Sequence, residues 1–111
     1  MRKNYFTKNE IVLCAYAALY DENEFGGING IHQLTRRSTS SISMKIRNIV
    51  AKLEEEGIPR NQRITPLTGT AQGNGGRPTN WEIVEPLARM PRQDLEAQCQ
   101  RIVAEAIPNA A

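Results

Sequence analysis

The sequence predicts one small, mainly α-helical domain that carries a single β-hairpin (α+β), arranged as a winged helix-turn-helix. Three observations lead to this prediction. Apolar residues recur at helical spacing over residues 42–53, a short helical segment and a tight turn precede them, and two short β-branched segments flank a glycine-rich stretch after them. A chain of 111 residues has room for one hydrophobic core. We therefore assign residues 1–111 to a single domain.

The first predicted helix covers about residues 7–20. Thr7 and Glu10 have the T-x-x-E spacing of a capping box, in which two free backbone N–H groups at a helix start are satisfied. Residues 11–20 are almost all apolar or small, so we expect other elements to surround this helix at the centre of the core. The following residues, 21–30, are rich in glycine and acidic side chains and are expected to form a loop.

A helix-turn-helix is predicted within about residues 30–57. A short helix over residues 31–35 is followed by a turn through Arg36 and Arg37, and then by a longer helix. Ser38 is expected to cap the start of this longer helix, and Gly57 to take the left-handed conformation that ends it. Its buried stripe is predicted to consist of Ile42, Ile46, Ile49, Val50 and Leu53.

Charge is distributed unusually along this longer helix. Between Arg36 and Lys52 there are five cations and no acid, and three acids follow at residues 54–56. Cations near the N-terminus of a helix and acids near its C-terminus interact unfavourably with the helix dipole, so helix stability does not explain this order. A polyanion that approaches the first turns does explain it, because phosphates or base edges then face the helix N-terminus. The alternative is a basic face that is simply solvated.

The distribution of charge along the whole chain supports the same interpretation. The net charge of +2 is too small to indicate a polyanionic partner. However, residues 25–53 and 57–81 contain no acid and hold eight of the fourteen Lys and Arg residues. Such clustering is typical of a nucleic-acid surface.

The wing hairpin is predicted over about residues 63–84. Two short segments, 63–68 and 79–84, flank the glycine-rich stretch GTAQGNGGRP, and Pro66 favours an edge strand. Arg77, which a proline follows, suits insertion into a narrow minor groove. The alternative is a mobile loop with one chance arginine. Trp81 is expected to pack the hairpin onto the core.

A final amphipathic helix is predicted over about residues 91–106. Its apolar stripe is expected to consist of Leu95, Cys99, Ile102, Val103 and Ala106. The helix either folds back on the first helix or pairs with its counterpart in a homodimer. We favour folding back, because a domain of this size needs the buried area.

The sequence offers little chemistry beyond binding. Cys14 and Cys99 fall on apolar helical faces, which favours reduced, buried thiols. A single histidine and the absence of a close cysteine pair argue against a metal site, and we expect neither a cofactor nor enzymatic activity. The apolar run 11–20 is about half the length that spans a bilayer, so we expect a soluble, cytoplasmic protein.

The run Arg37-Ser-Thr-Ser-Ser-Ile-Ser-Met-Lys-Ile-Arg-Asn48 resembles the R-S-x-x-S-V-x-M-K-L-x-N signature of certain helix-turn-helix modules. These modules occur at the N-terminal side of some bacterial and phage HNH-type endonucleases, and also as separate small proteins. The resemblance covers about residues 7–57 and implies a DNA-targeting role. The histidine-rich metal motif of the endonucleases is absent, so nuclease activity is not implied. The motif positions correspond to Arg37, Ser38, Ser41, Lys45 and Asn48.

The predicted function is binding of double-stranded DNA, as a small transcription regulator or as the targeting module of a nuclease system. The longer helix would read the major groove, and the wing would add a contact through Arg77. The alternative is a protein-interaction module, an inhibitor or adaptor of phage or mobile-element type, that uses the same basic surface. The DNA interpretation requires the cationic side of the helix to face solvent, and burial of Lys45, Arg47 and Asn48 under another part of the fold would contradict it. The predicted phosphate contacts are Arg36, Arg37, Lys52 and the helix N-terminus, where Ser38 lies. The predicted base-edge contacts are Ser40, Ser41, Lys45, Arg47 and Asn48.

Overall fold

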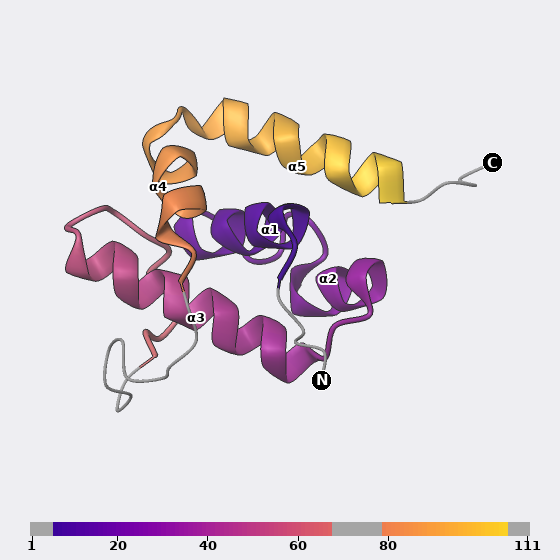
Figure 1. Cartoon of the computed structure of the whole chain (residues 1–111), viewed down its shortest axis with the longest axis horizontal. Coiled ribbons are helices and arrows are strands. Elements are labelled where there is room, and N and C mark those ends of the chain that lie inside the picture. Colours follow the sequence, from indigo (N-terminus) through magenta and orange to yellow (C-terminus); the bar gives the residue numbers. More distant parts are fainter. Residues whose placement is uncertain (1–5, 68–78, 107–111) are drawn as a thin grey trace.

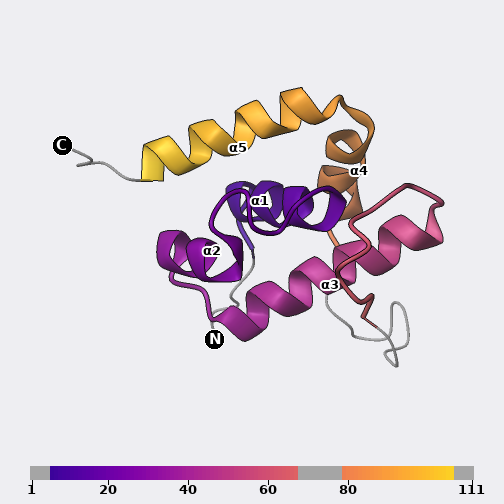
Figure 2. The same ribbon diagram turned by 180° about the vertical axis from the view of Figure 1, so that it is seen from behind.

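The computed structural model describes residues 6–67 and 79–106, and these residues form five helices and no strand (Figure 1). The helices are α1 (Lys8–Leu19), α2 (Gly27–Thr35), α3 (Thr39–Glu55), α4 (Trp81–Arg89) and α5 (Arg92–Ala106). Helix α1 lies at the centre, with α3 on one side and α5 on the other (Figures 1 and 2). It contacts each of the other helices.

The central position of α1 follows from its composition, because every residue from Glu10 to Leu19 is buried. The predicted capping box is confirmed. The backbone N–H of Thr7 donates to Oε1 of Glu10 over 2.8 Å, and the N–H of Glu10 donates to Oγ1 of Thr7 over 3.2 Å. The start of the core helix is therefore fixed by its own sequence.

Helix α3 also begins and ends as its sequence predicts. The N–H of Ser41 donates to Oγ of Ser38 over 3.1 Å, which makes Ser38 the N-cap. Gly57 follows the helix with a φ of 73°, the left-handed conformation that glycine adopts without strain. All residues of the predicted stripe are buried: Ile42, Ile46, Ile49, Val50 and Leu53.

Helix α2 begins earlier than predicted, so the expected loop over residues 21–30 is shorter. Gly26 and Gly27 have positive φ angles of 92° and 69°, and a Cβ at Gly26 would lie 2.9 Å from the backbone of Gly30. Both the left-handed conformation and the close approach require glycine. These glycines therefore lead the chain into a helix, although their composition indicated a loop.

The predicted wing, and with it the predicted α+β fold class, is wrong. Residues 79 and 80 lead into helix α4, and residues 63–67 have no regular structure. Alternation in the short run Trp81–Val84 favoured a strand, but Val84 and Leu87 are the buried residues and their spacing is helical. Pro86, a residue that disfavours helix interiors, lies inside α4. The predicted hairpin tip with Arg77 lies outside the described residues.

Helix α5 packs on α1, which confirms the fold-back prediction. Leu95 and Cys99 are buried in this contact, whereas Ile102 and Val103 are half-buried. The C-terminal half of α5 thus carries apolar atoms that are only partly covered. A homodimer through α5 stays a prediction.

The two cysteines are free and buried, as predicted. Burial raises the pKa of the Cys14 thiol and of the Cys99 thiol to about 12. In the part of the chain that the structure describes, no three side chains of the metal-binding types lie together. No helix there is both long enough and apolar enough to cross a membrane.

Candidate nucleic-acid interface

The turn between α2 and α3 is held by three hydrogen bonds. The hydroxyl of Thr35 donates to the carbonyl of Ile31 over 2.8 Å and accepts from the N–H of Arg37 over 3.2 Å. The Nδ1 atom of His32 lies 2.7 Å from the carbonyl oxygen of Arg37, and this contact requires the proton to be on Nδ1. The turn therefore presents the start of α3 in a fixed orientation.

Arg37 is part of the support of this turn. Its Nη2 atom donates to Oε1 of Glu10 over 2.9 Å, and each side chain of this ion pair is only 10% exposed. The guanidinium carbon also lies 3.9 Å from the centre of the Phe6 ring. Arg37 thus ties the turn to α1, and its predicted role as a phosphate anchor is not supported by its position.

Arg36 has the opposite character. Its backbone is left-handed, with φ 65° and ψ 8°, and its N–H donates to the carbonyl of His32 over 2.7 Å to end α2. Its side chain is exposed and has no hydrogen bond or ion pair with the other described residues. A left-handed residue other than glycine costs about 1 kcal/mol, and glycine is the usual residue here. Folding alone does not explain an arginine at this position.

Two of the predicted base-reading residues are covered by the segment that precedes α4. Lys45 is 2% exposed and its Nζ atom donates to Oδ1 of Asn80, while Asn48 is 7% exposed and its Oδ1 atom accepts from the Thr79 hydroxyl over 2.8 Å. Both residues lie on the flank of α3 next to its isoleucine stripe. The prediction left this flank open because it placed residues 79–84 in a wing strand.

Arg47 is partly engaged by another segment. Its Nε atom donates to the carbonyl of Thr65 over 3.1 Å, and its own carbonyl accepts from the N–H of Leu67 over 3.1 Å. Residues 65–67 therefore cross α3 at this point. The remaining guanidinium donors make no hydrogen bond within residues 6–67 and 79–106. Arg47 keeps part of its predicted binding capacity.

The basic windows of the sequence are largely neutralised in three dimensions. Of the seven cations in these windows that the structure describes, four form ion pairs with carboxylates: Arg37, Lys52, Arg60 and Arg63. Lys52, a predicted phosphate anchor, lies 3.2 Å from Glu56 and 3.5 Å from Glu55. Acids that are distant in sequence, such as Glu10 and Glu22, supply several of these partners. The basic surface of the folded chain is therefore smaller than the sequence predicted.

The first two turns of α3 remain accessible. Thr39 and Ser40 are exposed, whereas Ser43 and Met44 are half-buried. Together with Ile28 of α2, these residues line an open hollow of about 400 Å³. Ser41 is half-buried, and its Oγ atom accepts from the Ser38 hydroxyl over 3.0 Å.

We call the surface formed by Ile28, Arg36, Thr39, Ser40, Ser43, Met44 and Arg47 the α2–α3 face. Three residues of this face were predicted from the sequence as DNA contacts: Arg36, Ser40 and Arg47. The other residues of the face were not predicted. A signal for Ser43 and Met44 was present, since their positions in the helical period lie away from the isoleucine stripe. Ile28 was missed because it falls in the segment that was expected to be a loop.

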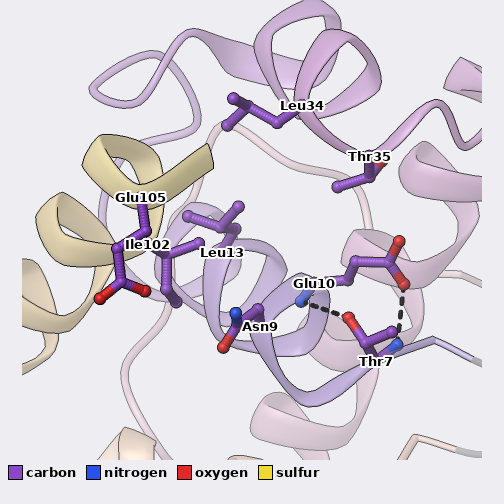
Figure 3. Close-up of a pocket in the computed structure, with 8 residues that line it drawn as sticks. All are labelled: Thr7, Asn9, Glu10, Leu13, Leu34, Thr35, Ile102 and Glu105. Carbon is purple, nitrogen blue, oxygen red and sulfur yellow. Dashed lines mark hydrogen bonds between the residues drawn. The ribbon is translucent and has the colours of Figure 1, made fainter. Parts of the chain in front are cut away.

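A second hollow, of about 290 Å³, lies between α1, α2 and α5 (Figure 3). Leu13, Leu34 and Ile102 contribute its apolar part, and its lining contains two acids and no cation. The Glu10 carboxylate there is already bound to the Thr7 N–H and to Arg37. This hollow does not suit a polyanion.

Comparison with known proteins assigns no family. No family model, curated protein or solved structure matches the chain. The resemblance of residues 37–48 to helix-turn-helix modules therefore stays a prediction. The function is inferred from the geometry of the α2–α3 face.

Proposed function

We propose that this chain binds double-stranded DNA through the α2–α3 face, as a helix-turn-helix whose described residues form no wing strand. The first two turns of α3 would enter the major groove, and the turn before them would lie against the phosphate backbone. The resemblance of residues 37–48 to DNA-targeting modules is consistent with this proposal. The surface is smaller than the one that the sequence predicted. Lys45 and Asn48 are buried, so the requirement that they face solvent is not met, and Arg37 and Lys52 are engaged elsewhere in the fold. The proposal therefore rests on Arg36, Arg47 and the first turns of α3.

The conformation of Arg36 is the observation that carries the proposal. A residue that adopts an unfavourable backbone conformation, and whose exposed side chain makes no hydrogen bond or ion pair with the other described residues, is a candidate for a functional role. Arg36 lies directly before the hydroxyl-rich start of α3, where the helix dipole also favours an anion. An arginine there can pair with a phosphate through two parallel hydrogen bonds.

The rest of the α2–α3 face has chemistry that suits a groove. Thr39, Ser40 and Ser43 carry hydroxyl groups that can contact phosphates or base edges. The remaining donors of Arg47 can pair with a guanine edge. No acidic side chain occurs in α3 before Glu54. A duplex therefore meets no negative charge from this helix along its first turns.

The structure supports fewer phosphate contacts than the sequence did. Arg36 and the start of α3 account for about two or three contacts per chain, so the slope of log affinity against log salt should be near −2 to −3. The four to six phosphate contacts expected from the sequence would give a slope of about −4 to −5. We therefore expect weak, salt-sensitive binding by a single chain.

A titration of labelled duplex DNA, followed by fluorescence anisotropy at several salt concentrations, tests the proposal. Arg36→Gly is the test variant. Arg101→Ala is its control, because Arg101 is an exposed arginine of α5, which lies across α1 from α3 (Figure 1). Both variants remove one positive charge. We expect Arg36→Gly to weaken binding and to reduce the salt slope by about 0.9, and Arg101→Ala to change neither.

An equal loss of DNA affinity in the two variants would mean that binding depends on the total charge of the chain and not on the position of the arginine. That result would contradict the proposed interface. Binding that does not respond to salt would contradict a phosphate-anchored complex. That result would favour the alternative protein-interaction module.

A further inference from the structure

The described residues that line the hollow in the α2–α3 face carry two apolar and three hydroxyl-bearing side chains, and no charged or amide side chain: Ile28, Thr39, Ser40, Ser43 and Met44. Ile28 and Met44 are both half-buried. Part of their apolar surface is therefore accessible to a partner that enters the hollow. This composition distinguishes the hollow from the neighbouring cations Arg36 and Arg47.

The composition limits which feature of a duplex the hollow can select. In the major groove, guanine is selected by paired hydrogen bonds from arginine, and adenine by paired bonds from asparagine or glutamine. None of the described residues that line the hollow has one of these side chains. Its hydroxyl groups both donate and accept, so they discriminate poorly between base edges. The remaining feature is the C5 methyl group of thymine, which apolar side chains contact.

We propose that the hollow between Ile28 and Met44 binds the C5 methyl group of thymine. This inference rests on the proposed DNA-binding function, and it names the base that the hollow selects, in addition to any guanine contact of Arg47. Burial of one methyl group corresponds to about a fourfold gain in affinity. The methyl group of 5-methylcytosine occupies the same position on the ring, so the hollow accepts that base as well.

Replacement of thymine by uracil tests the inference, because deoxyuridine keeps the hydrogen-bonding groups of thymidine and lacks only the methyl group. Two duplexes of the same sequence, one with thymine and one with uracil throughout, are titrated by fluorescence anisotropy. We expect the wild-type chain to prefer the thymine duplex by about fourfold for each methyl group bound. Met44→Ser should reduce this ratio toward one.

Arg36→Gly is the matched control, because it removes a phosphate contact and leaves the hollow unchanged. It should weaken binding to both duplexes by the same factor and so keep the thymine preference. Met44→Ala provides a second variant of the hollow, and thermal melting establishes that both Met44 variants are folded. A cytosine duplex and its 5-methylcytosine form give an independent comparison, in which the methylated duplex should bind more tightly.

Equal affinity of the wild-type chain for the thymine and uracil duplexes would overturn the inference and leave DNA binding intact. A preference that persists in folded Met44→Ser and Met44→Ala would also overturn it, because uracil would then act through the shape of the duplex. If the wild-type chain bound neither duplex, the proposed function itself would fail, and the inference with it.

Discussion

The ammonium group of Lys45 donates a hydrogen bond to the side-chain oxygen of Asn80, which joins the middle of α3 to the residue before α4. Asn80 itself is left-handed, with a φ of 63°. Burial lowers the pKa of Lys45 from its usual value, because the charged form is desolvated. Lys45 thus serves the fold, and the surface available to a partner is displaced toward the first turns of α3.

We predict that Lys45→Met is tolerated. The variant keeps the aliphatic stem and removes a buried charge, so we expect the free energy of unfolding to change by no more than about 1 kcal/mol. Lys45→Ala removes the stem as well and should cost about 2–4 kcal/mol. Urea denaturation measures both effects. If folded Lys45→Met lost DNA binding, Lys45 would be a contact after all, and the corrected interface would be wrong.

Arg36→Gly should stabilise the fold. Glycine adopts the left-handed conformation of this residue without a Cβ clash, so we expect a gain of about 1 kcal/mol and a higher melting temperature. Arg36→Ala is the matched control, because it removes the guanidinium and keeps the backbone strain; its stability should stay close to that of the wild type. Both variants should lose DNA affinity to the same extent. A destabilised Arg36→Gly would show that the side chain supports the fold.

The ion pair between Glu10 and Arg37 should contribute strongly to stability. Glu10→Gln keeps an acceptor for the Thr7 N–H but leaves a nearly buried guanidinium without its counter-charge, and we expect a loss of about 3 kcal/mol. Glu85→Gln is the control, because both side chains of the Glu85–Arg89 pair are exposed, by 42% and 56%. That change should cost at most about 1 kcal/mol. If thermal denaturation showed similar losses of stability in the two variants, a special role of the Glu10–Arg37 pair would be contradicted.

Glu22 should make stability depend on pH in the acid range. Hydrogen bonds from Arg63 and from the backbone, and a further one from Asn61, lower the pKa of Glu22 from 4.5 to about 2 in the folded chain. The folded state therefore favours the ionised carboxylate, and this stabilisation is present above pH 4.5 and is lost as the pH falls toward about 2. Urea midpoints of the wild type and Glu22→Gln should converge over this range. A constant difference between them would contradict the predicted pKa.

The buried thiols should be unreactive in the native state. Because burial raises the pKa of Cys14 and of Cys99 to about 12, almost no thiolate exists at neutral pH. A thiol reagent should label neither cysteine until denaturant is added, and labelling should then follow the unfolding transition. Rapid labelling of the folded chain would mean that the α1–α5 contact opens readily.

The elements that were predicted correctly have local signals. The capping box at Thr7 and Glu10, the isoleucine stripe of α3 and its N-cap Ser38 are each determined within a few residues, and the structure confirms them. The wing was predicted wrongly because a short run such as 79–84 fits both the two-residue period of a strand and the 3.6-residue period of a helix. The buried pair Val84 and Leu87, which decides for a helix, extends beyond that run.

The candidate site was less predictable, because several residues that were predicted as contacts are covered by segments that are distant in sequence. Asn80 and Thr79 lie more than thirty residues after Lys45 and Asn48, and Glu10 lies 27 residues before Arg37. No pattern within α3 indicates these partners. The accessible side of α3, by contrast, follows from the stripe, and it could have indicated Met44.

Amide chemical shifts of the isotope-labelled chain, followed during a titration with duplex DNA, show whether DNA contacts the α2–α3 face. We predict that the largest changes occur at Ile28, Arg36, Ser40 and Met44, and that they diminish as salt is added. Residues of α5 around Arg101 should not respond. Changes confined to α5, or no changes at DNA concentrations well above that of the chain, would contradict the account.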